Sequence, residues 1–146
     1  MNARTIVLRW PTGGAQLNIA SWFPASKTKL AHLHKLLSLD PVAAQPAVTA
    51  CLDCIRETEA VRKQSGQDNY RQYLELRQII ADAADQISTG TKPNGYPLSQ
   101  ADRETLREVR TRAKTRANRA AAAARRAERD IKHLRQNAAA IKAWGF

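Results

Sequence analysis

The fold is decided by residues 99–145, SQADRETLREVRTRAKTRANRAAAAARRAERDIKHLRQNAAAIKAWG. Pro97 stops any helix before this stretch, and Ser99 with Asp102 three residues later forms a start that resembles a capping box. No proline or glycine then occurs until Gly145. We therefore expect one helix over 99–144, roughly 45 residues and about 65 Å long at 1.5 Å per residue.

A narrow apolar seam follows one side of this predicted helix. Its members recur at steps of three or four residues, the spacing of a single helical face. They are Leu106, Val109, Ala113, Ala117, Ala120, Ala124, Ala127, Ile131, Leu134, Ala138 and Ile141. The steps from Val109 to Ala113 and from Ala113 to Ala117 are both of four residues. This extra step of four indicates a stutter, and the steps from Ala117 onward alternate as in a heptad repeat. Alanine buries little area, so the seam is too weak to hold a two-stranded coil alone. We expect it to pack against helices of the same chain.

The remainder of the helix is strongly basic. Residues 110–126 contain seven bases and no acid, namely Arg110, Arg112, Lys114, Arg116, Arg119, Arg125 and Arg126. Like charges one helical turn apart repel each other, and an anionic partner removes that repulsion. Guanidinium groups also match the geometry of phosphate oxygens. These seven residues are therefore our candidate nucleic-acid-binding set.

The net charge of +11 is concentrated at the two ends of the chain. Residues 1–40 hold five bases and one acid, 41–98 hold six and seven, and 99–146 hold thirteen and five. This imbalance favours partners that are nucleic acid, a nucleoprotein complex or an acidic protein surface.

The N-terminal part predicts a different element. Apolar residues alternate on either side of a Pro-Thr-Gly-Gly turn at 11–14, which indicates a β-hairpin. Helical periodicity follows, interrupted by Ser65-Gly66 and by a loop over 89–98. The predicted elements are a hairpin over 1–24, a short helix over 26–39, two medium helices over 41–64 and 67–88, and the long helix over 99–144. The fold class is therefore mainly α, with α+β character at the N-terminus. We expect a single domain over 1–146, in which the hairpin precedes a helical bundle with one very long basic C-terminal helix.

The sequence shows no recognisable catalytic constellation, so we expect no enzyme activity and no cofactor. Cys51 and Cys54 have the C-x-x-C spacing of zinc sites and redox dithiols. A zinc site needs two further ligands, and His32 and His34 point apart on a helix. We therefore expect structural cysteines and no metal. No apolar run approaches the about 18 residues of a membrane span, and no export signal is recognisable, which predicts a cytoplasmic protein with no membrane partner.

An acidic stripe lies on the predicted helix over 67–88. Asp68, Glu75 and Asp82 fall seven residues apart, and Asp85 follows one turn later. The stripe could face the basic helix and screen it, or leave it free for a partner. The sequence leaves both alternatives open.

A short segment of the long helix resembles the basic region of basic leucine zippers. Asn118, Ala121, Ala122 and Arg126 fall at the positions that point into the DNA major groove in that family. The leucine that begins the zipper ten residues on is replaced by Gln136. The resemblance covers nine residues, and we carry over no base-reading role.

Two classes of function remain. The first is a non-enzymatic binding protein that docks on nucleic acid or a nucleoprotein complex through the arginine-rich face of its long helix, largely by phosphate contacts. The alternative is a small phage or mobile-element type inhibitor or adaptor, for example anti-CRISPR-like, that binds a nucleic-acid-processing protein. Its apolar anchors would be Trp10, Trp22, Trp144 and Phe146. The last two could instead fill the chain's own core.

Overall fold

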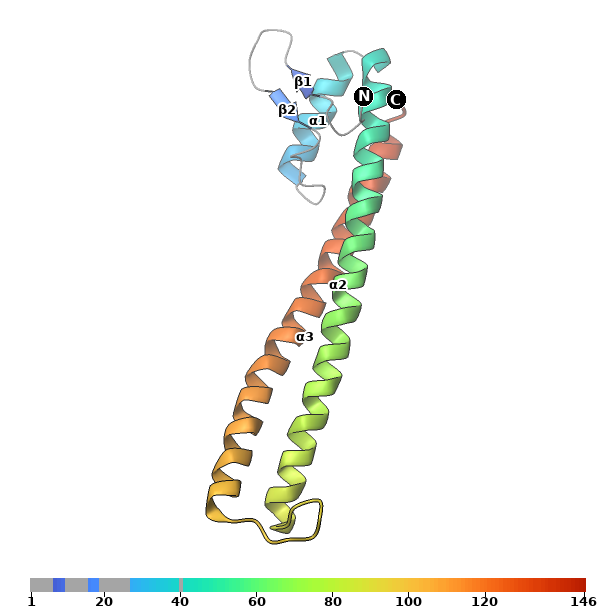
Figure 1. The fold of residues 1–146 in the computed structure, drawn as a ribbon. Helices are drawn as coiled ribbons and strands as arrows, with labels where there is room; N and C mark the ends of the chain where they lie inside the picture. Colours follow the sequence, from blue (N-terminus) through green and yellow to red (C-terminus); the bar gives the residue numbers. More distant parts are fainter. Residues whose placement is uncertain (1–6, 10–15, 19–26, 40) are drawn as a thin grey trace. The chain divides into compact units, whose positions relative to one another are not determined.

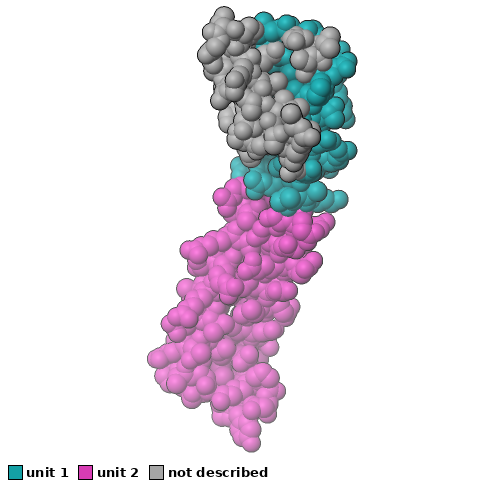
Figure 2. Space-filling view, turned by 45° about the horizontal axis from the view of Figure 1, so that its top comes forward, with its two compact units in different colours: residues 1–63, 128–146 teal, residues 64–127 magenta. Residues whose placement is uncertain are grey.

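The computed structural model describes residues 7–9, 16–18, 27–39 and 41–146, and this part of the chain is mostly helical. Its elements are β1 (Val7–Arg9), β2 (Gln16–Asn18), α1 (Lys27–Leu39), α2 (Pro41–Thr89) and α3 (Gln100–Ala143) (Figure 1). Two compact units are formed (Figure 2). Unit 1 consists of residues 1–63 and 128–146, and unit 2 consists of residues 64–127. Within each unit the two long helices pack together. Whether the chain acts as the single domain that we expect stays a prediction.

The two short strands lie in the predicted hairpin. β1 and β2 pair antiparallel, with Leu8 opposite Leu17. The turn at 11–14 and most of residues 1–24 lie outside the described residues. The full hairpin therefore stays a prediction.

The middle of the chain differs from the prediction of two medium helices. α2 is one continuous helix of 49 residues that passes through Ser65-Gly66 without a break. A Cβ atom placed on Gly66 would lie 3.2 Å from the Cβ of Ala127 on α3, closer than ordinary contacts. The predicted break was wrong because this glycine allows the close approach of two helices. Packing of α2 against α3 offsets the about 1 kcal/mol that glycine costs in a helix interior.

Unit 2 is an antiparallel helical hairpin, formed by the second half of α2, a loop and the first part of α3 (Figure 1). Gly90, at a φ of 71°, ends the first helix in the left-handed conformation that glycine favours. A bridge between Thr91 and Pro97 then closes the loop.

The predicted capping box starts α3. The Ser99 N–H donates to Asp102 Oδ2, and the Asp102 N–H donates to Ser99 Oγ, both at 3.1 Å. These bonds, with Lys92 Nζ 3.2 Å from the same carboxylate, lower the pKa of Asp102 below its usual value. The carboxylate therefore stabilises this helix start above its ordinary pKa, and the contribution is lost as the pH falls through the lowered value.

The seam of α3 differs from its predicted course at one position. Val109 is 39% exposed, whereas Arg110 is half-buried and occupies the seam in its place. With Arg110 included, steps of four and three alternate without a stutter from Leu106 to Ile141. Hydrophobicity alone selected Val109, but the position of a residue in the heptad decides which side chain faces the neighbouring helix.

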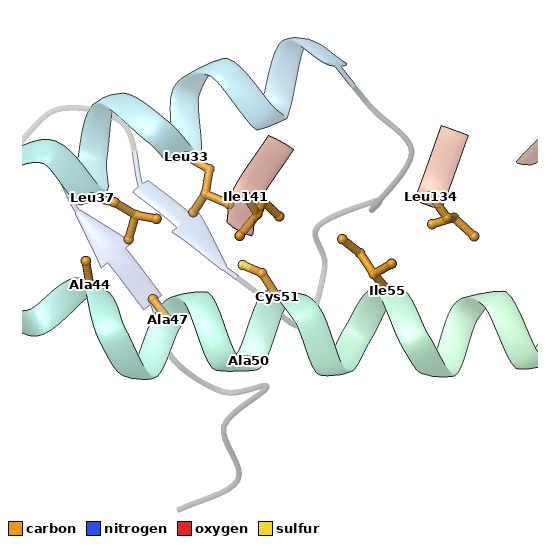
Figure 3. Close-up of a cluster of buried hydrophobic side chains, with 9 residues drawn as sticks. All are labelled: Leu33, Leu37, Ala44, Ala47, Ala50, Cys51, Ile55, Leu134 and Ile141. Atoms are coloured by element: carbon orange, nitrogen blue, oxygen red, sulfur yellow. The ribbon is translucent and has the colours of Figure 1, made fainter. Parts of the chain in front are cut away.

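The core of unit 1 is built from three helices. Side chains of α1, α2 and α3 converge in one cluster (Figure 3). Its largest members are Leu33 and Leu37 from α1, Ile55 from α2, and Leu134 and Ile141 from α3, each with 2% or less of its surface exposed. Alanines of α2 fill the remaining space. None of the helices in the described ranges combines the length and apolarity that a bilayer span requires.

Candidate nucleic-acid interface

The seven candidate residues lie on α3 within unit 2. Arg112 is exposed and pairs with Glu108 on its own helix at 3.3 Å. Five others are exposed and have no ion pair within the described part of the chain. They are Lys114, Arg116, Arg119, Arg125 and Arg126. Their charges are therefore available to solvent or to a partner.

Arg110 is placed differently from the other six. It lies in the seam between α2 and α3, where its Nε atom is buried and has no hydrogen-bond partner among the described residues. A buried polar group without a partner costs free energy. Its partial burial separates Arg110 from the exposed members of the candidate nucleic-acid-binding set in which the sequence placed it.

The packing of unit 2 fixes which residues share a face. On α2 the inward positions include Gly66, Tyr73, Leu76, Ile80 and Ala83. Leu76 packs against Ala113 and Ala117 of α3. The inward residues of both helices therefore occupy positions a and d of a heptad abcdefg. Positions c and g then lie on one flank of each helix, and e and b lie on the other.

The antiparallel arrangement brings like flanks together. Two antiparallel helices are related by an approximate twofold axis perpendicular to them, so the same heptad letter lies on the same side of both. Unit 2 therefore has a c/g face and an e/b face, each formed by both helices. The close approach of Gly66 and Ala127 sets the register of the two helices. Each residue after Gly66 on α2 is level with one residue before Ala127 on α3.

The c/g face contains an arginine stripe and three residues of the acidic stripe, whereas Asp85 lies at an f position, outside this face. The arginine stripe consists of Arg112, Arg116, Arg119 and Arg126. In the register above, Asp68, Glu75 and Asp82 lie level with Arg126, Arg119 and Arg112 respectively, to within about one residue or about 1.5 Å along the axis. Asp102 of α3 also occupies a g position, but its carboxylate is paired with Lys92 at 3.2 Å. Three acids of α2 thus lie level with three of the four arginines on this face.

No ion pair joins the acidic stripe to α3 among the residues that the structure describes. The contacts of the stripe are instead within α2. Asp68 Oδ1 lies 3.9 Å from a guanidinium nitrogen of Arg71, and Asp82 Oδ1 accepts a hydrogen bond from Gln78 Nε2. The acidic stripe therefore reduces the potential over the arginine stripe without binding its side chains.

The e/b face has a different composition, and we call it the tyrosine face. Its distinctive residues are Tyr70, Leu74 and Arg77 from α2 and Arg107, Lys114 and Arg125 from α3. Four bases meet only one acid at these positions, Glu104 near the loop. Tyr70 and Leu74 are 56% and 46% exposed. This face therefore combines a clear positive excess with exposed aromatic and aliphatic surface.

Four of the six residues that define the tyrosine face were missed by sequence reasoning. Tyr70, Arg77 and Arg107 lie outside the basic run at 110–126, so a search for charge density does not select them. The signal that could have identified them is the heptad phase. When Arg110 instead of Val109 is assigned to the seam, the other basic residues of the run at 110–126 divide between the c/g face and the e/b face.

The predicted apolar anchors are located in part. The rings of Trp144 and His34 stack with centroids 4.5 Å apart, and Phe146 meets both rings edge-on. Trp144 and Phe146 are half-buried against the core of unit 1, which favours the alternative that they fill the chain's own core. Trp10 and Trp22 lie outside the described residues.

Cys51 belongs to the core of unit 1, whereas Cys54 lies outside the core cluster. Cys51 is fully buried, and burial together with the neighbouring Cys54 raises the pKa of its thiol to about 12. Both cysteines are free, and Cys54 is half-buried. No group of three or more potential metal ligands occurs in the ranges that the structure describes.

We expect the two thiols to react at different rates. At pH 8 a thiol reagent should modify Cys54 well before Cys51, because only the thiolate reacts and burial keeps Cys51 protonated. Between pH 9 and about 12 the folded chain retains a proton on Cys51 that the unfolded chain loses, so this residue lowers stability as the pH rises through that range. Mass spectrometry of Cys51→Ser and Cys54→Ser chains labelled by the reagent measures each rate. Equal rates in the folded proteins would contradict the burial of Cys51.

Comparison of the chain with protein-family models, with curated proteins and with solved structures gives no significant match.

Proposed function

We propose that this protein is a non-enzymatic nucleic-acid-binding protein that docks on nucleic acid, or on a nucleoprotein complex, through the cationic surface of α3 in unit 2. One observation carries the proposal. Five exposed bases of a 17-residue stretch without acids have no ion-pair partner in the described part of the chain, although acidic residues are present in the same unit. Docking occurs largely through phosphate contacts, because phosphates supply the charge that these side chains lack.

The test is a fluorescence-anisotropy titration with labelled DNA and RNA, single-stranded and duplex, at about 50 and about 200 mM salt. The wild-type chain should bind, and its affinity should fall steeply with salt. Replacing Lys114, Arg119 and Arg125 with glutamine should lower both the affinity and the salt dependence, by about 0.7–0.9 in slope for each phosphate that the variant no longer neutralises.

The matched control removes the same charge from the same helix outside unit 2. Arg129, Lys132 and Lys142 are also exposed bases of α3, and their replacement with glutamine should leave most of the affinity intact. Absence of binding by the wild-type chain at low salt would refute the proposal. Equal losses of affinity in the two triple variants would show that only net charge matters.

No specific observation favours the alternative that the protein is an inhibitor or adaptor. Two of its four anchors, Trp144 and Phe146, pack against their own unit, and the other two lie outside the described residues. The complete hairpin over 1–24 and a cytoplasmic location also stay predictions from the sequence.

A further inference from the structure

The two faces of unit 2 differ in charge, although α3 supplies bases to both. On the c/g face, four arginines lie among three carboxylates of α2, those of Asp68, Glu75 and Asp82. On the tyrosine face, four bases meet one acid at the end of the hairpin. A polyanion that approaches unit 2 is therefore attracted more strongly to the tyrosine face. This contrast is invisible in α3 alone, because α2 provides the acids.

Like charges are placed together on the tyrosine face. Arg77 of α2 and Lys114 of α3 occupy facing e positions, about two residues or about 3 Å apart along the axis in the register set by Gly66 and Ala127. Facing e positions usually hold opposite charges, because these residues set the pairing of helices. Arg77 is held in place by the ring of Tyr73, with its guanidinium carbon 5.7 Å from the ring centroid. An anion between the two bases would remove their repulsion.

Exposed apolar surface accompanies these charges. In the same register, the axial positions of Tyr70 on α2 and Arg125 on α3 differ by about two residues. Leu74 lies one helical turn after Tyr70 on α2. A duplex presents only phosphates and sugars to a flat helical face, whereas a single strand also presents the faces of its bases. Aromatic rings beside basic side chains are the usual combination in proteins that bind single strands.

From this combination we infer that the tyrosine face is a docking site for single-stranded nucleic acid, whose phosphates contact Arg77, Lys114 and Arg125 while a base stacks on Tyr70. This inference rests on the proposed function and specifies its face and its class of ligand. The arginine stripe, although richer in arginine, is the weaker site because the acidic stripe offsets its charge.

The experiment compares two double variants of equal charge on α3. The first replaces Lys114 and Arg125 with glutamine, and the second replaces Arg119 and Arg126. All four residues are exposed and have no ion pair in the described ranges, so neither variant removes an ion pair of the folded chain. The probes are labelled oligothymidylate and oligouridylate and a duplex of the same length. The first variant should lower the salt slope for the single strands by about 1.4, at about 0.7 per phosphate, and the second by less than half as much.

A second pair of variants tests stacking. Tyr70→Ala should weaken binding of the single strands by about five- to 150-fold, and Tyr70→Phe should preserve it, because the ring and not the hydroxyl stacks. Tyr96→Ala, in the loop and 68% exposed, is the control that should have no effect. Circular dichroism checks that each variant remains helical.

The outcomes separate the inference from the proposed function. If the wild-type chain binds single strands but the two double variants lose affinity equally, or Tyr70→Ala binds as the wild type does, the tyrosine face is wrong and the proposed function survives. Tighter binding of the duplex than of both single strands would also overturn the inference. If the wild-type chain binds no nucleic acid at low salt, both fail.

Discussion

Replacement of Gly66 with leucine is expected to lower the free energy of unfolding by about 1–3 kcal/mol, the usual cost of overpacking. Even a single Cβ at this position would lie 3.2 Å from Ala127, so a full side chain must push α2 and α3 apart. Because the backbones are close here, neither helix can move without disturbing the alanine contacts along the seam. Chemical denaturation followed by circular dichroism measures the change.

The control for this prediction is the next residue along α2. Gln67 is exposed, so Gln67→Leu adds a similar side chain on the solvent side and should change stability by less than about 0.5 kcal/mol. Equal stabilities of the two leucine variants would contradict the close approach of the helices. Exchanging the two small residues, as Gly66→Ala with Ala127→Gly, should be tolerated far better than leucine because it keeps one methyl group at the crossing.

Arg110→Leu should have the opposite effect and raise the free energy of unfolding by about 1–3 kcal/mol. The substitution removes a buried Nε that has no partner in the described part of the chain and replaces it with a side chain suited to a seam position. Thermal or chemical denaturation measures the gain. Arg110→Leu should retain nucleic-acid binding, because Arg110 occupies a seam position, with its Nε atom buried, rather than a position on either face.

Arg112→Leu is the matched control for the seam position. It removes an arginine of the same helix that is exposed and paired only with Glu108, so no comparable gain in stability is expected. A lower free energy of unfolding for Arg110→Leu than for the wild-type chain would contradict this prediction. It would show that the guanidinium of Arg110 is hydrogen-bonded and stabilises the folded chain.

The sequence was most informative about α3. Its capping box at Ser99 and Asp102, and the absence of any breaker before Gly145, predicted a helix that the structure places at Gln100–Ala143. These are local signals, and local signals can be recognised without knowing what packs on the helix. The predicted mainly helical fold is confirmed for the same reason.

The errors occurred where tertiary packing decides the outcome. Ser65-Gly66 has the composition of a break, yet contact with α3 keeps α2 helical through it. Arg110 is polar, yet the heptad phase places it inward and leaves Val109 exposed. The second error affected the candidate site, because the division of the bases between two faces follows from that phase. The opposing carboxylates come from α2, so no inspection of α3 alone could reveal them.

The division of the chain into units also constrains how it folds. Unit 2 forms from contacts between neighbouring parts of the chain, which favours rapid folding. Unit 1 joins residues 1–63 to residues 128–146 across an intervening segment of 64 residues. Closing a flexible loop of that length costs on the order of 3–4 kcal/mol in chain entropy. A folded hairpin removes most of that cost by bringing its two ends together. The alanine seam of unit 2 should therefore favour assembly of the core of unit 1.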